Sequence, residues 1–159
     1  MPSNLEHPLP PAHPHIQSGT ALILIVDADR RIRHINLALS QLMGYAGAQL
    51  IGHPFPLLRH PDMPASAMRE MWAQVDAGAP WIATLALRRR DGNRLWALAT
   101  CAPVRHPRLG ACVMIVLMRP SDAQLHAALT SYEHQHNRIS IWLDKLMLEP
   151  LALDDVTRW

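Results

Sequence analysis

Several kinds of residue are scarce in this 159-residue chain, and each scarcity excludes a class of protein. The two cysteines, Cys101 and Cys112, are spaced like neither a zinc ligand pair nor a redox dithiol. No apolar run approaches the roughly 20 residues that cross a bilayer, and no signal peptide begins the chain. The formal net charge of +2 does not favour nucleic acid. We therefore expect a cytoplasmic protein with reduced thiols and no direct membrane span.

The composition that remains is that of a globular protein. Hydrophobic residues make up 49% of the chain and charged residues 18%, enough to build one core. Residues 1–19 differ, because prolines interrupt them at five positions and favour an extended, disordered tail. His7, His13 and His15 lie in this tail, but ordering a mobile segment around a metal ion costs entropy, so we expect no metal site.

The first half of the predicted domain combines two strands with short helices. Residues 21–26 are apolar and rich in β-formers, and residues 31–36 alternate charged with apolar side chains, so the two should form a hairpin. Glycine and proline interrupt residues 37–63, which indicates short helical turns. Residues 64–77 have one apolar face and predict a longer helix that ends at Gly78.

Three further strands are predicted over residues 81–90, 94–104 and 111–118, joined by turns. We expect an α+β fold over residues 20–120, with a five-stranded antiparallel sheet covered on one face by short helices. The covered face should enclose a ligand-sized cavity. The last two strands could also place Cys101 opposite Cys112, which leaves a regulatory disulfide as the alternative to two free thiols.

A helix is predicted over residues 121–148, followed by a short tail over 149–159. Its apolar positions are separated alternately by four and three residues, the period of a coiled coil, and they are Leu125, Leu129, Tyr132, His136, Ile139, Leu143 and Leu146. We expect a homodimer through this signalling helix. The alternative is that the apolar stripe packs back on its own domain. His136 fits a register-setting polar position better than a phosphoryl acceptor.

A set of linked motifs carries a family resemblance. The run Arg59-His60-Pro61-Asp62-Met63-Pro64 is followed by Met71-Trp72, by Gly78-Ala79-Pro80-Trp81 and by Arg88 to Trp96. Together they resemble the PAS domain of aerotaxis receptors over roughly residues 20–120. The resemblance implies a PAS fold and a sensor of redox state or oxygen that binds FAD noncovalently. It also implies a signalling partner, such as a chemoreceptor or kinase, and no enzymatic reaction.

The resemblance also implies which residues surround the flavin. They are Asn36, Arg59, His60, Asp62, Trp81 and Leu87. An indole can stack on a flavin or adenine plane, while Arg59 and His60 can address phosphate or ring heteroatoms and Asp62 can orient them. Leu87 and Thr100 stand where the family has amide side chains, so Leu87 cannot donate a hydrogen bond to the flavin edge.

Three alternatives to an FAD sensor remain open at this point. Arg59, His60 and Asp62 could simply hydrogen-bond a loop while tryptophans fill the core. Haem could bind through His53 or His60, as in gas-sensing PAS domains. The domain could also be a cofactor-free module for dimerisation or docking. An enzyme lacks support, because no nucleophile, metal cluster or phosphate loop is recognisable in the sequence.

Overall fold

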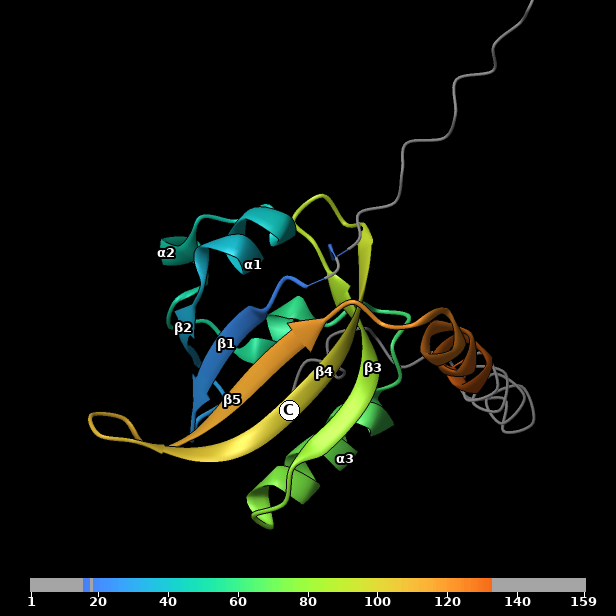
Figure 1. Cartoon of the computed structure of the whole chain (residues 1–159). Helices are drawn as coiled ribbons and strands as arrows, with labels where there is room; N and C mark the ends of the chain where they lie inside the picture. Colours follow the sequence, from blue (N-terminus) through green and yellow to red (C-terminus); the bar gives the residue numbers. More distant parts are fainter. Residues whose placement is uncertain (1–15, 18, 133–159) are drawn as a thin grey trace, which may run out of the picture.

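The computed structural model describes residues 16–17 and 19–132. Its elements in chain order are β1 (Leu22–Asp27), β2 (Ile32–Ile35), α1 (Leu37–Met43), α2 (Gly47–Leu50), the 3-10 helix η1 (Phe55–Leu58), α3 (Ala65–Asp76), β3 (Trp81–Arg88), β4 (Arg94–His106) and β5 (Gly110–Met118). A further helix, here called the C-terminal helix, is described over residues 122–132 (Figure 1). Tyr132 is the last described residue, so the predicted seam from His136 to Leu146 lies outside the described residues.

The strands form one antiparallel sheet in the order β2-β1-β5-β4-β3. The predicted hairpin of β1 with β2 and the predicted meander of β3, β4 and β5 are both confirmed. The two units are joined by β1 and β5, which pair from Leu22 opposite Leu117 to Asp27 opposite Cys112. The two parts of the sheet are therefore joined by strands whose paired residues lie more than 80 positions apart in the chain.

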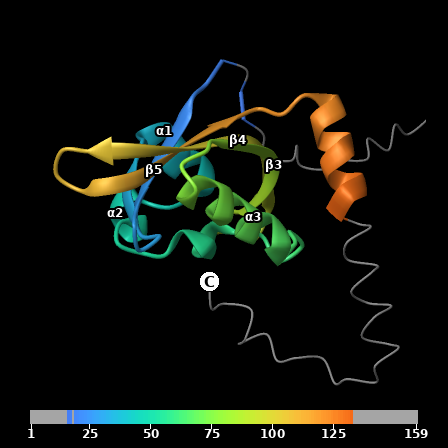
Figure 2. The ribbon, with the colours of Figure 1, turned by 90° about the horizontal axis from the view of Figure 1, so that it is seen from below.

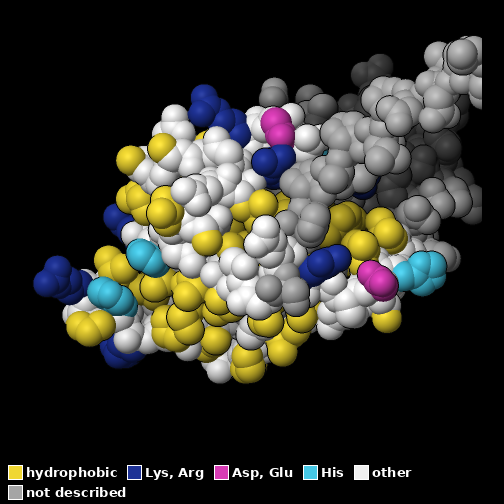
Figure 3. Space-filling model, turned by 45° about the horizontal axis from the view of Figure 1, so that its top comes forward, with side chains coloured by type: hydrophobic (Ala, Val, Ile, Leu, Met, Phe, Trp, Pro, Cys, Tyr) yellow, Lys and Arg dark blue, Asp and Glu magenta, His cyan; other side chains and the backbone are white. Residues whose placement is uncertain are grey.

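Helices cover one face of this sheet. Figure 2 shows α3 beneath β3 and β4. Along β4, fully buried side chains alternate with more exposed ones, as expected of a strand with one covered face. The buried residues are Leu95, Ala97, Ala99 and Cys101, all at 0% exposure. The opposite face is also apolar and only partly covered, since Tyr132 of the C-terminal helix stacks on Trp96 there: Ile82 is 63% and Met118 48% exposed, and hydrophobic side chains gather on this face in Figure 3.

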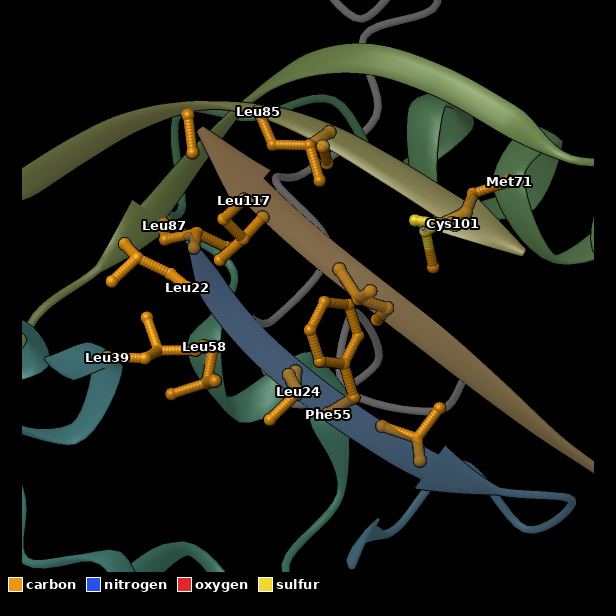
Figure 4. Packing of buried hydrophobic residues seen from close by; sticks show 14 of the residues in the cluster. Leu22, Leu24, Leu39, Phe55, Leu58, Met71, Leu85, Leu87, Cys101 and Leu117 are labelled. Carbon is orange, nitrogen blue, oxygen red and sulfur yellow. Dashed lines mark hydrogen bonds between the residues drawn. The ribbon is translucent and has the colours of Figure 1, made fainter. Parts of the chain in front are cut away.

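The space between sheet and helices is filled, which corrects the expected ligand-sized cavity. Leu85, Leu87 and Met68 point inward from β3 and α3 and are at most 3% exposed. The same core cluster contains Met63 together with Leu58, Met71 and Phe55, which are labelled in Figure 4. The Phe55 ring meets Trp72 edge to face at 5.8 Å. Because Leu85, Leu87 and Met68 have almost no accessible surface, no flavin-sized space adjoins them.

The two cysteines lie on opposite faces of the sheet. Cys101 is opposite Ile115 and points inward, where its Sγ lies 3.5 Å from Met71 Sδ. Cys112 is opposite Asp27 and Val104 and points to the other face. Both thiols are free and buried, and burial raises the pKa of Cys101 to about 12. A disulfide between them is therefore excluded by the direction of their side chains.

Candidate functional site

The free edge of β3 brings two remote parts of the chain together. β3 is the last strand of the sheet, and an edge strand leaves backbone groups without a partner strand. Here Arg59 forms an isolated β-bridge with Leu87, and the backbone N–H of His60 donates to the Ala86 carbonyl at 3.1 Å. Further along the same edge, the Tyr132 hydroxyl donates to the Thr84 carbonyl at 2.5 Å. Residues 59–64 and the C-terminal helix are thus attached to the same edge.

Residues 59–64, here called the 59–64 segment, are held mainly by their own hydrogen bonds. The Arg59 guanidinium is half-buried and donates to the Met63 carbonyl at 2.9 Å. The Met63 side chain is 1% exposed and anchors the segment in the core. Burial lowers the pKa of Arg59, but a guanidinium stays charged at any physiological pH. Arg59 therefore shapes the segment and keeps a positive charge next to Leu87.

His60, Asp62 and Arg94 form a polar cluster at one end of β3 and β4. His60 Nδ1 accepts from the Asp62 backbone N–H at 3.1 Å, and Asp62 Oδ2 lies 3.4 Å from the Arg94 guanidinium. Burial lowers the pKa of His60; the Asp62 charge opposes this and the charges of Arg94 and Arg88 add to it. The imidazole is therefore neutral at pH 7, with Nδ1 already used as an acceptor.

Trp81 and Leu87 lie at opposite ends of β3. Trp81 is opposite Cys101 and Leu87 is opposite Leu95, and both side chains are buried on the inner face. Six residues of strand separate them by about 20 Å. Of the six predicted site residues, the structure brings Arg59, His60, Asp62 and Leu87 together and leaves Trp81 apart.

Asn36, the sixth predicted residue, fastens α1 to β1. Its Oδ1 accepts from the backbone N–H groups of Leu39 and Ile23, each at 3.2 Å, and its Nδ2 donates to the Ala21 carbonyl at 3.1 Å. Oδ1 therefore caps the first turn of α1 and pairs with the neighbouring strand. The amide is engaged by the fold on both its oxygen and its nitrogen.

Sequence reasoning missed the contacts made by Thr84, Trp96 and Tyr132. The Trp96 and Tyr132 rings stack at 5.9 Å with an interplanar angle of 15°, in addition to the hydrogen bond to Thr84. Burial raises the pKa of Tyr132 to about 12, so its hydroxyl stays a donor at physiological pH. The alternation of β4 places Trp96 on the outer face, but no local signal pairs it with a residue 36 positions later.

The comparisons with known proteins identify the family. The family described as the PAS fold matches residues 17–120. This chain belongs to the PAS family. It is 30% identical over 130 residues to the aerotaxis receptor of Escherichia coli (strain K12), across 77% of this chain and 26% of the receptor. The chain thus spans about a quarter of that curated relative. The predicted resemblance to aerotaxis receptors is confirmed.

Solved structures support the same fold. A light-oxygen-voltage domain studied with a flavin analogue matches with a TM-score of 0.61 at 21% identity, covering 73% of this chain and 89% of that one. The dark state of the blue-light photoreceptor Aureochrome1 LOV matches with a TM-score of 0.60 at 20% identity, covering 72% and 86%. Within the described residues, no helix of this PAS domain is long and apolar enough to cross a membrane.

The interior of this PAS domain does not fit a flavin ring as it is packed. An isoalloxazine edge carries several nitrogen and oxygen atoms, and each one buried without a partner costs about 1–3 kcal/mol. The inward wall offers Leu85, Leu87, Leu95 and alanines, and the one buried side-chain polar atom without a partner among the described residues is Trp72 Nε1. For haem, His53 is exposed to solvent, and His60 Nδ1 already accepts a hydrogen bond from the Asp62 backbone N–H.

Replacing Asn36 by alanine tests whether this residue belongs to the fold. We expect Asn36→Ala to lower the free energy of unfolding by about 1–2 kcal/mol without any added cofactor, because it removes an N-cap and the hydrogen bonds to Ile23 of β1 and to Ala21 just before it. Asn36→Asp keeps the accepting oxygen and should lose less. Urea unfolding followed by circular dichroism measures both changes. Equal stability of wild type and Asn36→Ala would contradict the structural assignment.

Proposed function

We propose that this chain is a sensory PAS module, not an enzyme, in which the 59–64 segment controls whether the C-terminal helix stays docked on the sheet. The observation that carries the proposal is the shared edge of β3: His60 caps the Ala86 carbonyl and Tyr132 caps the Thr84 carbonyl. The two acceptors are two residues apart on one strand, a distance of about 7 Å. A movement of the β3 backbone at Ala86 therefore occurs directly beside the carbonyl that holds Tyr132.

The relay needs only two positions of the helix. In the docked position Tyr132 stacks on Trp96 and donates to Thr84. A shift of the 59–64 segment moves the β3 edge and weakens that hydrogen bond. A net loss of about 1 kcal/mol changes the ratio of docked to released helix about fivefold. A signal can shift the equilibrium between docked and released helix only by the difference in its interaction free energy with the two states.

The helix is also the surface that we propose for the signalling partner. Along its described part, Ala128 is buried and Tyr132 faces the domain, while Leu129 is 36% exposed. The predicted seam thus packs partly on its own domain, which is the alternative reading of the apolar stripe. We propose that release of Tyr132 makes the seam available to a second copy of the chain, and through this homodimer to a chemoreceptor or kinase. A cytoplasmic location belongs to the same proposal.

Two candidate functions differ in the cofactor. The resemblance to the aerotaxis receptor, and the flavin named for one similar light-oxygen-voltage domain, support a sensor of redox state or oxygen that binds FAD. Arg59, His60 and Asp62 are the polar groups that FAD would meet beside Leu87, and bound FAD would supply a change of charge on reduction. The leucine-filled interior favours the second candidate, a cofactor-free module for dimerisation or docking.

Replacing Tyr132 by phenylalanine tests the relay. Tyr132→Phe keeps the ring stack and removes the hydroxyl, so backbone amides in residues 125–132 should exchange about fivefold faster. Tyr45→Phe is the matched control, because the Tyr45 hydroxyl makes no hydrogen bond within the described part of the chain. Hydrogen exchange read by NMR compares the two variants. Identical exchange in both would show that the hydroxyl does not hold the helix.

A visible spectrum after incubation with excess FAD and gel filtration tests the cofactor. The packed interior predicts no stoichiometric flavin absorbance in the wild-type protein. Leu87→Asn restores the amide of the family, and Leu87→Ala opens space without adding a polar group, so the pair separates hydrogen bonding from volume. Stoichiometric flavin in the wild type would establish that the interior opens and would favour the FAD sensor. A Soret band in the purified protein would favour haem.

A further inference from the structure

A hollow lies outside the core, at the end of the sheet where the C-terminal helix begins. Its volume is about 530 Å³, within the range of small-molecule sites. Four parts of the chain line it: Ile16 before β1, the 59–64 segment through His60 and Asp62, the start of β4 through Arg94 and Trp96, and the connection into the C-terminal helix through Arg119 and Leu125. We call this hollow the junction cleft, because it separates the sheet from the start of the helix.

Two arginines and two aspartates line the junction cleft, so their formal charges balance, but only Arg94 and Asp62 are an ion pair among the described residues. Arg94 shares its charge with Asp62 at 3.4 Å, whereas Arg119 has neither an ion pair nor a hydrogen bond among the described residues. Asp122 also lines the cleft, but it lies in the first turn of the C-terminal helix, where the helix dipole offsets a negative charge. His60 is neutral at pH 7 because burial lowers its pKa. Arg119 is therefore the arginine of the cleft whose guanidinium is available to an anion.

The rest of the lining is apolar and partly aromatic. Trp96 is half-buried and presents its indole to the cleft next to Pro120 and Leu125. An indole face stabilises a planar ring by stacking, and a guanidinium pairs with a carboxylate through two parallel hydrogen bonds. Trp96 also packs against the hydrophobic core and stacks on Tyr132, whereas Arg119 is exposed to solvent. The chemistry of the lining is that of a site for a planar molecule with one negative end.

We propose that the junction cleft binds a small organic anion, with its carboxylate on Arg119 and Arg94 and its planar body on Trp96. Such a ligand touches the 59–64 segment and the C-terminal helix at once, so it stabilises the docked helix and not the released one. This regulatory consequence rests on the proposed relay, whereas the binding itself does not. The cleft shares His60 and Asp62 with the residues that FAD would meet, but it lies outside the interior that Leu85 and Leu87 fill.

The test uses 2-naphthoate as the probe, titrated into the full chain and followed by amide and indole NMR signals. We expect saturable shifts at Arg94, the Trp96 indole and Leu125, and none at Leu85 or Leu87. The neutral 2-naphthalenemethanol and the cationic 2-naphthylmethylammonium have the same ring system and should bind at least tenfold more weakly, because they cannot pair with a guanidinium. Equal affinity for the three probes, shifts centred on the interior, or no saturable shift overturns the site.

Arginine variants test the residue that carries the charge. Arg119→Gln should weaken 2-naphthoate about tenfold, while Arg108→Gln, an exposed arginine on the β4–β5 turn, should leave the affinity unchanged. Affinity that is insensitive to Arg119→Gln overturns the assignment of the anion.

Amide exchange in residues 125–132 separates the site from the relay. Bound 2-naphthoate should slow this exchange. Binding without slowing overturns the regulatory role and leaves the site. A faster exchange in Tyr132→Phe together with absent binding overturns the site and leaves the relay.

Discussion

The exposed edge of β3 is the constraint on which the rest of the arrangement depends. A strand at the edge of a sheet must find partners for its outward carbonyls, because each one buried without a partner costs about 1–3 kcal/mol. In this domain the partners are the His60 backbone N–H and the Tyr132 hydroxyl, which come from before and after the strand. The need to satisfy the edge therefore ties the motif segment and the C-terminal helix to the same short stretch of backbone.

The family resemblance places the functional site in the interior of the domain, whereas the structure places the polar residues of the motif at the rim of the sheet. The resemblance directs attention to the covered face, but Leu85, Leu87 and Met68 close that face. The polar residues of the motif instead lie at the rim, where His60 and Asp62 line the junction cleft beside the start of the C-terminal helix. The fold is compatible with a filled interior, because hydrophobic residues of sufficient volume keep the sheet and the helices packed.

The local parts of the fold could be predicted from the sequence, and the remote contacts could not. The hairpin of β1 with β2, the meander of β3 to β5 and helix α3 follow from alternation, turn residues and one apolar helix face. The pairing of β1 with β5 joins strands that no short pattern links. The filled interior depends on how side chains from α3, η1 and β3 pack together, and the pattern of one segment alone does not predict such packing.

The candidate site shows the same division. Arg59, His60 and Asp62 cluster because they are neighbours in the chain, and the rise per residue of the extended strand β3 already puts Trp81 far from Leu87. The cap formed by Asn36 also has a local signal, since an asparagine directly before a helix is a favoured N-cap. The stack of Tyr132 on Trp96 has none, because it depends on where the chain returns after β5.

The most direct test of coupling along β3 removes one backbone hydrogen bond from the 59–64 segment. His60→Pro abolishes the N–H that caps Ala86, and Arg59 already has the extended backbone that a following proline requires, with φ −73° and ψ 130°. His60→Ala keeps that N–H and removes only the imidazole. Coupling predicts faster amide exchange in residues 125–132 for His60→Pro than for His60→Ala, with the core equally protected in both. Equal exchange in the helix of the two variants would contradict it.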